Sequence, residues 1–185
     1  MLSWIILIIL AAVVIAAAVI FNRLVRARQM AREAWSGIDV QLKRRAELVP
    51  NLVETVKGYA VHERGVLEEV TRLRGQASAL PRDDIAGRAH AESGLSQALG
   101  RLIALAESYP DLKANGNFLE LQRQLSTLEN ELQMARRYYN GTVRNLNILV
   151  ESVPSNLVAG AFGFKRADFF ELNDAAERVA PAVAL

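Results

Sequence analysis

A short stretch of the chain holds the residues best suited to chemistry. Residues 34–60 read AWSGIDVQLKRRAELVPNLVETVKGYA, with the basic triplet Lys43-Arg44-Arg45 and then Pro50, and His62-Glu63 follow directly. Three adjacent cations could bind the phosphates of nucleic acid or of anionic lipid. A histidine beside a glutamate on a helix is half of the zinc-protease motif His-Glu-x-x-His. Each possibility depends on what the rest of the sequence supplies.

The neighbouring residues argue against catalysis and metal binding. Position 66, where a second zinc-binding histidine would lie, is Val66, and the only other histidine in the chain is His90. There is no cysteine, which excludes a zinc-thiolate cluster, a disulfide or a thiol nucleophile. The sequence also lacks a glycine-rich phosphate loop, a Ser-His-Asp set and a well-spaced acid pair. We therefore expect a protein that is not an enzyme and uses no metal or other cofactor.

The charge balance argues against nucleic acid as a partner. The chain has 22 basic and 20 acidic residues, a net charge of +2, whereas nucleic-acid binders concentrate Lys and Arg. On a helix, Asp39 precedes Lys43 by one turn in the favourable order for an ion pair, and Arg44 can point outward. Arg45 falls on the apolar face, as does Glu63, and the two are too far apart to meet. Arg45 should therefore pair with another helix or another chain.

The elements that position these residues start with an apolar N-terminal segment. Leu2–Phe21 reads LSWIILIILAAVVIAAAVIF and has no charged residue, and a helix of this length spans the roughly 30 Å hydrocarbon core of a bilayer. A cleaved signal peptide normally begins with Lys or Arg, but here the basic residues follow the apolar run. We predict a retained transmembrane anchor over residues 1–22, with the N-terminus outside and the body in the cytoplasm. The membrane-proximal basic residues are Arg23, Arg26, Arg28 and Arg32.

Hydrophobic spacing predicts an all-α antiparallel bundle over residues 23–153. Apolar residues recur in alternating steps of three and four from Trp35 to Leu80, interrupted only by Arg45 and Glu63. Pro81 ends this stripe, and the same rhythm predicts a second helix over residues 83–108 and a third over 118–153. No segment alternates strictly enough to be a strand. The predicted fold is thus a transmembrane helix that continues into three long helices, followed by a short C-terminal helix.

Two geometries fit the first long helix. The alternating spacing of three and four residues continues through Pro50 without interruption, and a proline inside a helix can kink the helix without ending it. The helix could therefore run from Arg32 to Ala79, ~72 Å. The returning helix would then be too short to cover the membrane-proximal stalk, and its apolar stripe would have no partner within the chain. In the alternative, the chain reverses at Pro50 and closes a four-helix bundle that buries the same stripe.

The C-terminal segment, residues 154–185, differs from the bundle because it holds four of the six phenylalanines. Disordered tails are rarely so aromatic, so we predict that it docks on its own or a neighbouring chain, with a short helix near residues 174–179. Together with the uncovered stripe, these aromatic residues form a candidate assembly surface. Its members are Trp35, Ile38, Leu42, Arg45, Val49, Phe162, Phe164, Phe169 and Phe170.

Several phrases of this sequence resemble the LemA family of bacterial membrane proteins. They are the opening stretch, YPDLKAN at residues 109–115, ARRYYN at 135–140, FGF at 162–164 and the pair Phe169-Phe170. The resemblance implies one N-terminal helix in the bacterial inner membrane and a helical bundle facing the cytoplasm. It brings no established catalytic residues, and it suggests an adaptor role beside membrane proteases under membrane stress.

The function predicted from the sequence is that of a membrane-anchored, non-enzymatic helical scaffold that self-assembles through its stalk and tail. The partners expected are the lipid bilayer and further copies of the chain, with another membrane protein as a further candidate, but not nucleic acid. Two alternatives stay open. The protein could be an adaptor for a membrane protease or another envelope-stress partner, or it could sense the lipid surface through its membrane-proximal arginines.

Overall fold

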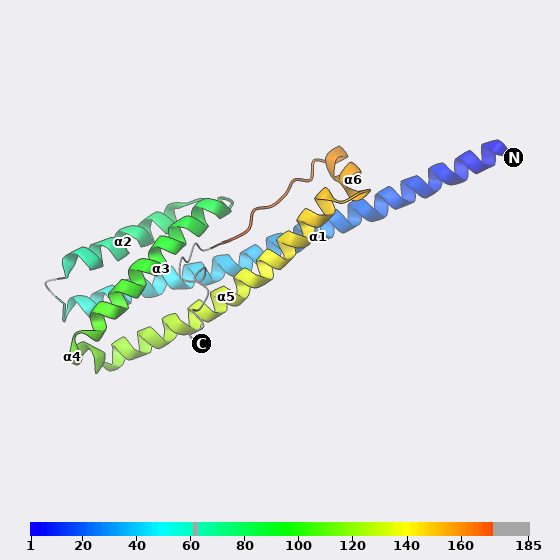
Figure 1. The fold of residues 1–185 in the computed structure, drawn as a ribbon. Coiled ribbons are helices and arrows are strands. Elements are labelled where there is room, and N and C mark those ends of the chain that lie inside the picture. The colour runs from blue at the N-terminus through cyan, green and yellow to red at the C-terminus, as the bar shows by residue number, and fades with distance from the viewer. Residues whose placement is uncertain (61–62, 172–185) are drawn as a thin grey trace, which may run out of the picture. The chain divides into compact units, whose positions relative to one another are not determined.

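The computed structural model describes residues 1–60 and 63–171, which are mostly helical and include no strand. The prediction of an all-α bundle with a long N-terminal helix is confirmed. Figure 1 shows the helices in chain order. They are α1 (Leu2–Lys57), α2 (Arg64–Ala79), α3 (Ile85–Glu107), α4 (Pro110–Lys113), α5 (Gly116–Glu151) and α6 (Ser155–Ala161). The short helix predicted over 174–179 lies outside the described residues, as does His62.

The first part of α1 has the surface that a lipid-facing helix needs. By length and composition, α1 is the one helix in the described part of the chain that could cross a membrane. Its large apolar side chains between Leu2 and Val19 are exposed, with none packed into a protein core. In water that surface would need a protein partner to cover it, whereas hydrocarbon accommodates it directly.

The course of the chain after Pro50 differs from both predicted geometries. Helix α1 continues through Pro50, so the predicted reversal there is wrong. It ends at Lys57, and α2 starts at Arg64, so the predicted single helix over residues 32–79 is also wrong. The turn that follows α1 is marked by hydrogen bonds from the Tyr59 and Ala60 amides to the Val56 carbonyl. The apolar residues of α2 continue the three-four spacing of α1, because both helices face the same core. The spacing therefore does not reveal that α1 ends at Lys57.

The chain forms two compact units. The N-terminal unit comprises Met1–Gly37 and Arg137–Phe169, and the bundle unit comprises Ile38–Arg136 with the chain from Phe170 onward. Helices α1 and α5 each contribute residues to both units. We describe each unit separately below.

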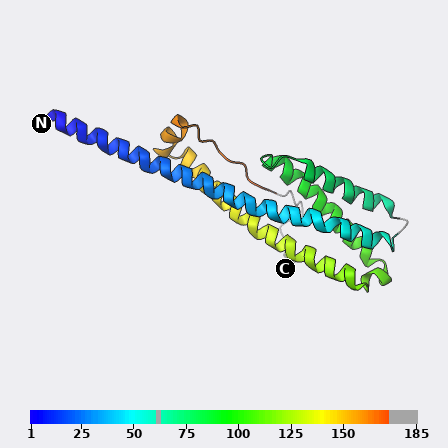
Figure 2. The ribbon, with the colours of Figure 1, turned by 180° about the vertical axis from the view of Figure 1, so that it is seen from behind.

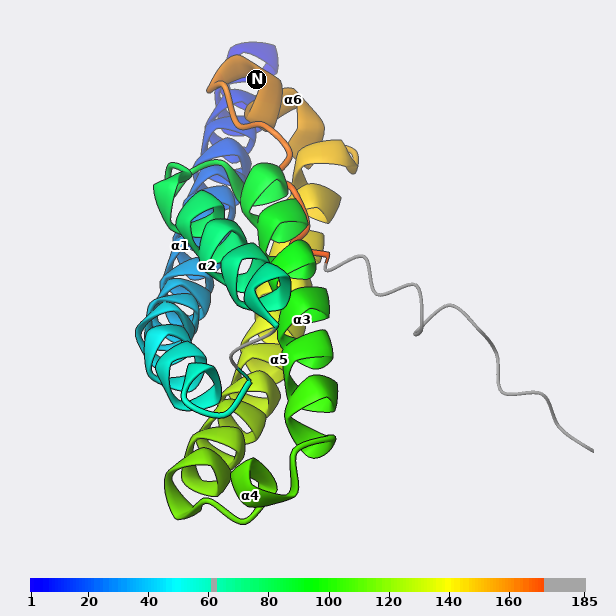
Figure 3. The same ribbon diagram turned by 90° about the vertical axis from the view of Figure 1, so that its left-hand side faces the viewer.

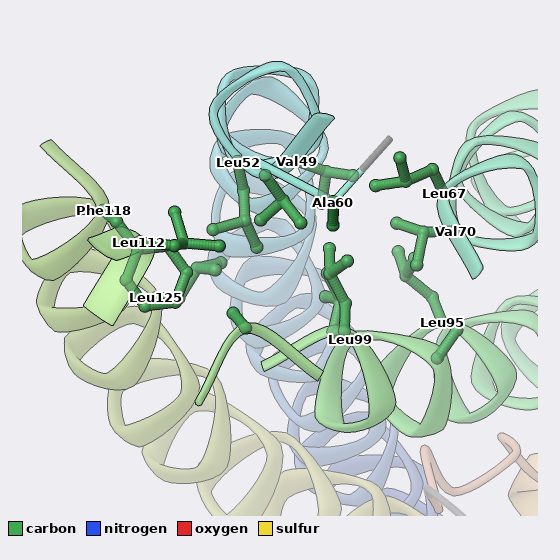
Figure 4. Packing of buried hydrophobic residues seen from close by; sticks show 14 residues of the cluster. Val49, Leu52, Ala60, Leu67, Val70, Leu95, Leu99, Leu112, Phe118 and Leu125 are labelled. Atoms are coloured by element: carbon green, nitrogen blue, oxygen red, sulfur yellow. The ribbon is translucent and has the colours of Figure 1, made fainter. Parts of the chain in front are cut away.

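The bundle unit is held together by an apolar core to which five helices contribute (Figure 4). Helices α2 and α3 lie side by side in it, as Figure 3 shows. Each fully buried aliphatic side chain contributes roughly 1.5–3 kcal/mol of transfer free energy. The core includes Val49, Leu52 and Val56 of α1, Leu67 and Val70 of α2, Leu95, Leu99 and Leu102 of α3, Leu112 of α4, and Phe118 and Leu125 of α5.

Side-chain caps define where two of these helices begin. The Asp84 carboxylate accepts a hydrogen bond from the Gly87 amide, 2.9 Å, at the start of α3. At the start of α5, Asn115 Oδ1 accepts from the amides of Asn117 and Phe118, 2.9 and 3.1 Å. Such caps pair backbone amides that have no partner within the helix.

The cap on α3 gives a first prediction. Asp84→Ala should lower the free energy of unfolding by about 1 kcal/mol, because it leaves the Gly87 amide without its acceptor. Asp83→Ala is the matched control, since it changes the neighbouring exposed aspartate. Urea unfolding of the protein in detergent micelles, followed by circular dichroism, measures both. Equal midpoints for the two variants would contradict the capping role.

Candidate functional site

In the N-terminal unit, α6 packs on α1 where the apolar run ends. Leu24 of α1 is completely buried in a cluster with Ala159 of α6 and Phe164. Figure 2 shows α6 alongside this part of α1. Gly163 connects α6 to Phe164 with a φ of +68°, a backbone conformation that favours glycine. Further side chains packed against the cluster are Ile20, Phe21, Val25, Leu149, Val150 and Val158.

Aromatic rings and one arginine complete this contact. The Phe21 ring centroid lies 4.8 Å from that of Phe162 and 5.8 Å from that of Phe164, the latter edge to face. The Arg28 guanidinium lies 4.7 Å from the Phe164 ring centroid, within cation–π range. Among the four predicted membrane-proximal arginines, Arg28 is therefore half-buried and contacts an aromatic ring. The other three, Arg23, Arg26 and Arg32, are exposed.

The extended segment after Phe164 is fastened to α5 by polar contacts. The Asn147 side chain donates to the Ala167 carbonyl, 3.0 Å, and accepts from the Ala167 amide, 2.9 Å. The Tyr139 hydroxyl donates to the Asp168 carbonyl at 2.8 Å. Burial, with a smaller effect of the Asp168 charge, raises the pKa of Tyr139 to about 12, so its phenol stays a donor at neutral pH. These bonds hold residues 167 and 168 against the helix.

The four aromatic residues predicted for the tail have different environments. Phe162 is 62% exposed although its ring contacts Phe21, whereas Phe164 is buried. Phe169 is half-buried, and Phe170, in the bundle unit, is completely buried. The structure therefore brings Phe162 and Phe164 together with Phe21, a residue that the sequence analysis did not single out. Its position as the last apolar residue before Asn22 and Arg23 was the available signal.

The structure corrects the predicted open stripe on the stalk. Ile38, Leu42 and Val49 are at most 2% exposed, so these side chains are packed within their own chain. Trp35 is half-buried, with its ring 5.4 Å from that of Tyr139 on α5. The physical reason is the early end of α1, because the returning helices then have enough length to cover its apolar face. These residues stabilise the fold and do not present a free apolar surface.

Arg45 is paired as expected, and its partners belong to its own chain. The guanidinium is 1% exposed and contacts Glu92 Oε2 at 3.2 Å and Glu129 Oε1 at 2.8 Å. It also donates to the Ser96 hydroxyl at 2.7 Å. Glu92 and Ser96 lie one turn apart on α3, and Glu129 lies on α5. Arg45 therefore joins three helices of the bundle unit.

A second ion pair continues this buried charge cluster. Arg88 donates to Asp39 at 2.7 Å, and Arg82 lies 3.4 Å from the other oxygen of the same carboxylate. The predicted partner of Asp39 was Lys43, but Asp39 instead pairs with these arginines of the α2–α3 turn and α3. Arg44 points outward as predicted, 3.6 Å from Glu131.

Glu92 is the most buried carboxylate of the cluster. Its burial raises the pKa of the carboxyl, and the charges of Arg45 and Arg88 oppose that rise, while the Glu129 charge adds to it.

The buried charged groups of this cluster form ion pairs with one another. Hollows of about 190 and 330 Å³ flank the cluster, one reaching Glu92 and Arg88 and the other Arg45 and Glu129. Of the charged groups that line them, Arg45 pairs with Glu92 and Glu129, and Arg82 and Arg88 pair with Asp39. Within residues 1–60 and 63–171, no group of three His, Asp or Glu side chains could hold a metal ion. The exposed arginines and aromatic residues beside the end of the apolar run are therefore the better candidate for a functional surface.

Comparison with known proteins agrees with this geometry. The sequence profile of the LemA family matches residues 34–185. The chain belongs to the LemA family. With its long apolar N-terminal helix, this LemA-family chain is a membrane-associated helical protein.

Curated relatives are similar over most of the chain. Magnetosome protein MamQ 2 of Paramagnetospirillum magneticum is 26% identical over 175 residues, an alignment that covers 82% of this chain and 64% of the relative. Magnetosome protein MamQ of Magnetospirillum gryphiswaldense is 25% identical, with 81% and 64% covered. Protein LemA of Metamycoplasma hominis is 27% identical, with 83% and 69% covered. The chain thus spans less than two thirds of the length of the MamQ relatives.

The tyrosine bond to the extended segment gives a second prediction. Tyr139→Phe keeps the ring but removes the donor to the Asp168 carbonyl, which should cost about 1 kcal/mol and loosen residues 165–168. Trypsin should then cut faster after Lys165 and Arg166 in this LemA-family chain. Tyr138→Phe changes the neighbouring tyrosine, which is 56% exposed, and serves as the control. Unchanged cleavage in Tyr139→Phe would show that the bond does not hold the segment.

The buried carboxyl of Glu92 gives a prediction for pH. Its raised pKa means that the folded state retains a proton that the unfolded state has released. The stability that this group contributes is therefore present at low pH and is lost as pH rises through the raised pKa. As pH rises above about 4.5, the ordinary pKa of a glutamate, the stability of Glu92→Gln should therefore increase relative to that of wild type. Unfolding curves across that range measure the difference.

The control for this pH prediction is Glu54→Gln, which removes a glutamate whose side chain is 71% exposed and solvated in both states. The difference in free energy of unfolding between Glu54→Gln and wild type should not change with pH in the way predicted for Glu92→Gln. If the stability of Glu92→Gln relative to wild type stays constant or falls as pH rises, the predicted effect of burying this carboxyl is contradicted.

Proposed function

We propose that this chain is a membrane-anchored, non-enzymatic helical scaffold whose copies associate side by side. The exposed apolar part of α1 supports the anchor, and the basic residues that follow it favour a bundle facing the cytoplasm across the bacterial inner membrane. The self-paired charge cluster supports a structural role for the polar interior. The assembly surface is placed on α5, because the stripe on α1 is buried.

The observation that carries the proposal is a glycine on the outer face of α5. In the N-terminal unit, Tyr138 and Ile148 are 56% and 53% exposed, and Gly141 lies between them on the same helical face. A glycine inside a helix costs about 1 kcal/mol relative to alanine. A Cβ at Gly141 would meet no atom within 4 Å, so packing within the chain gives no reason for the glycine. A glycine between exposed apolar residues lets a second helix approach closely.

A second glycine with open space beside it lies on α1 of this unit. Met30 is 41% exposed, and a Cβ at Gly37, two helical turns further along, would also meet no atom within 4 Å. Two helices of one unit therefore each present a glycine that leaves room for a neighbour. This face would equally suit an adaptor that binds another membrane protein. Whether the particle extracted from the membrane holds only copies of this chain or also another protein distinguishes the two functions.

The scaffold predicts a particle of several copies. The full-length protein extracted in mild detergent should have a protein mass several times that of the 20.4 kDa chain by light scattering. Gly141→Leu should reduce that mass towards a single chain, because the new side chain blocks close approach. Gly75→Leu is the matched control, since Gly75 is a helical glycine on α2 where an added Cβ would likewise have no atom within 4 Å.

Circular dichroism should show that both glycine variants remain helical. A wild-type particle that holds only one copy would contradict the scaffold. An unchanged mass in Gly141→Leu would contradict the role of α5.

A further inference from the structure

We propose that α6 and its flanking residues lie in the headgroup layer of the membrane and bind an anionic phospholipid surface. This contact would be the second that the chain makes with the bilayer, after the apolar part of α1. The proposal requires that α1 crosses the membrane, but it does not depend on self-association.

The packing of α6 fixes its depth relative to the membrane. Phe21 is the last residue of the apolar run, and Arg23 follows it closely. The Phe162 ring lies 4.8 Å from the Phe21 ring, and Leu24 is buried against Ala159 of α6. A helix that packs on these turns of α1 must lie where α1 leaves the hydrocarbon. All these residues belong to the N-terminal unit.

One face of α6 packs on α1 and the opposite face is open and apolar. Ser155 and Ala159 are buried, whereas Leu157, on the opposite face, is 71% exposed. Val153, just before α6, is 80% exposed, and Phe162, just after it, is 62% exposed although its ring contacts Phe21. No charged residue occurs between Glu151 and Lys165. Where α1 leaves the hydrocarbon, the headgroups and upper acyl chains can cover this apolar face and shield it from water. Helices that lie in the membrane interface are covered in the same way.

The charges around this face match an anionic lipid surface. Arg23 and Arg26 are exposed on α1 directly after the apolar run, and Lys165 is exposed after α6. Of the acidic residues beside this face, Glu151 pairs with Arg166 at 2.9 Å, and Asp168 is exposed. Basic residues beside a membrane helix are attracted to anionic headgroups. An open apolar face with this basic rim, at the depth where α1 leaves the bilayer, therefore fits lipid.

Spin-label accessibility tests the proposal in the full-length chain. The sequence has no cysteine, so Leu157→Cys and Val153→Cys each give a single labelling site on the open face. Leu119→Cys is the control, because Leu119 is 48% exposed near the start of α5 in the bundle unit and lies outside the proposed assembly face. Each labelled protein is placed in nanodiscs of phosphatidylcholine, with or without phosphatidylglycerol. Collisions with a water-soluble nickel chelate and with oxygen, which concentrates in lipid, are then measured.

Labels at 157 and 153 should collide several-fold less with nickel, and more with oxygen, than the label at 119. Phosphatidylglycerol should increase this difference, and the double variant Arg23→Gln with Lys165→Gln should remove the increase. Equal nickel collisions at 157, 153 and 119 would overturn the proposal. Low collision rates with both reagents would also overturn it, because they would mean that protein covers the face.

Discussion

The burial of Leu24 between α1 and α6 is the contact on which the N-terminal unit depends. Up to Val19 the large apolar side chains of α1 are exposed, whereas Ile20 and Phe21 are partly buried and Leu24 is completely buried. The Phe21 and Phe164 rings close over this transition, and Arg28 sits on the latter. Because the chain has to return from the end of α5 to make this contact, α6 and the extended segment after it are held beside α1. The position of the proposed lipid-binding surface on the protein follows from that one packing contact.

The bundle unit depends on a different constraint, a charge inside its apolar stripe. Removing the Arg45 guanidinium from water is costly, and the cost is offset only because Glu92, Ser96 and Glu129 all meet it. These partners come from two other helices, so the cluster is satisfied in only one register of α1 against α3 and α5. A wholly apolar stripe would tolerate sliding by one helical turn. The charge cluster thus favours one arrangement of the bundle at the expense of some stability.

Periodic features of the sequence predicted the helical architecture, but contacts distant in sequence could not be predicted. The stripes on α3 and α5, with Pro81 and Pro154 near their ends, located those helices closely. The reversal after Lys57 was missed because no proline marks it and the apolar phase of α1 continues in α2. The wrong expectation of an exposed stripe at Ile38 and Leu42 followed from that single error.

Arg45 was correctly expected to need a partner, although nothing in a single sequence could indicate which glutamates supply it. Helix α6 was missed because its seven residues are too few and too uniformly uncharged to show a helical period.

The central claim is that residues 155–168 form a folded element fastened to α1 and α5 beside the end of the apolar run. Hydrogen–deuterium exchange of the full-length protein in lipid nanodiscs tests it most directly. The amides of α6, and the Ala167 amide that donates to Asn147, should exchange as slowly as those in the middle of α5. Exchange of this segment at the rate of an unstructured peptide, while α5 remains protected, would contradict the account.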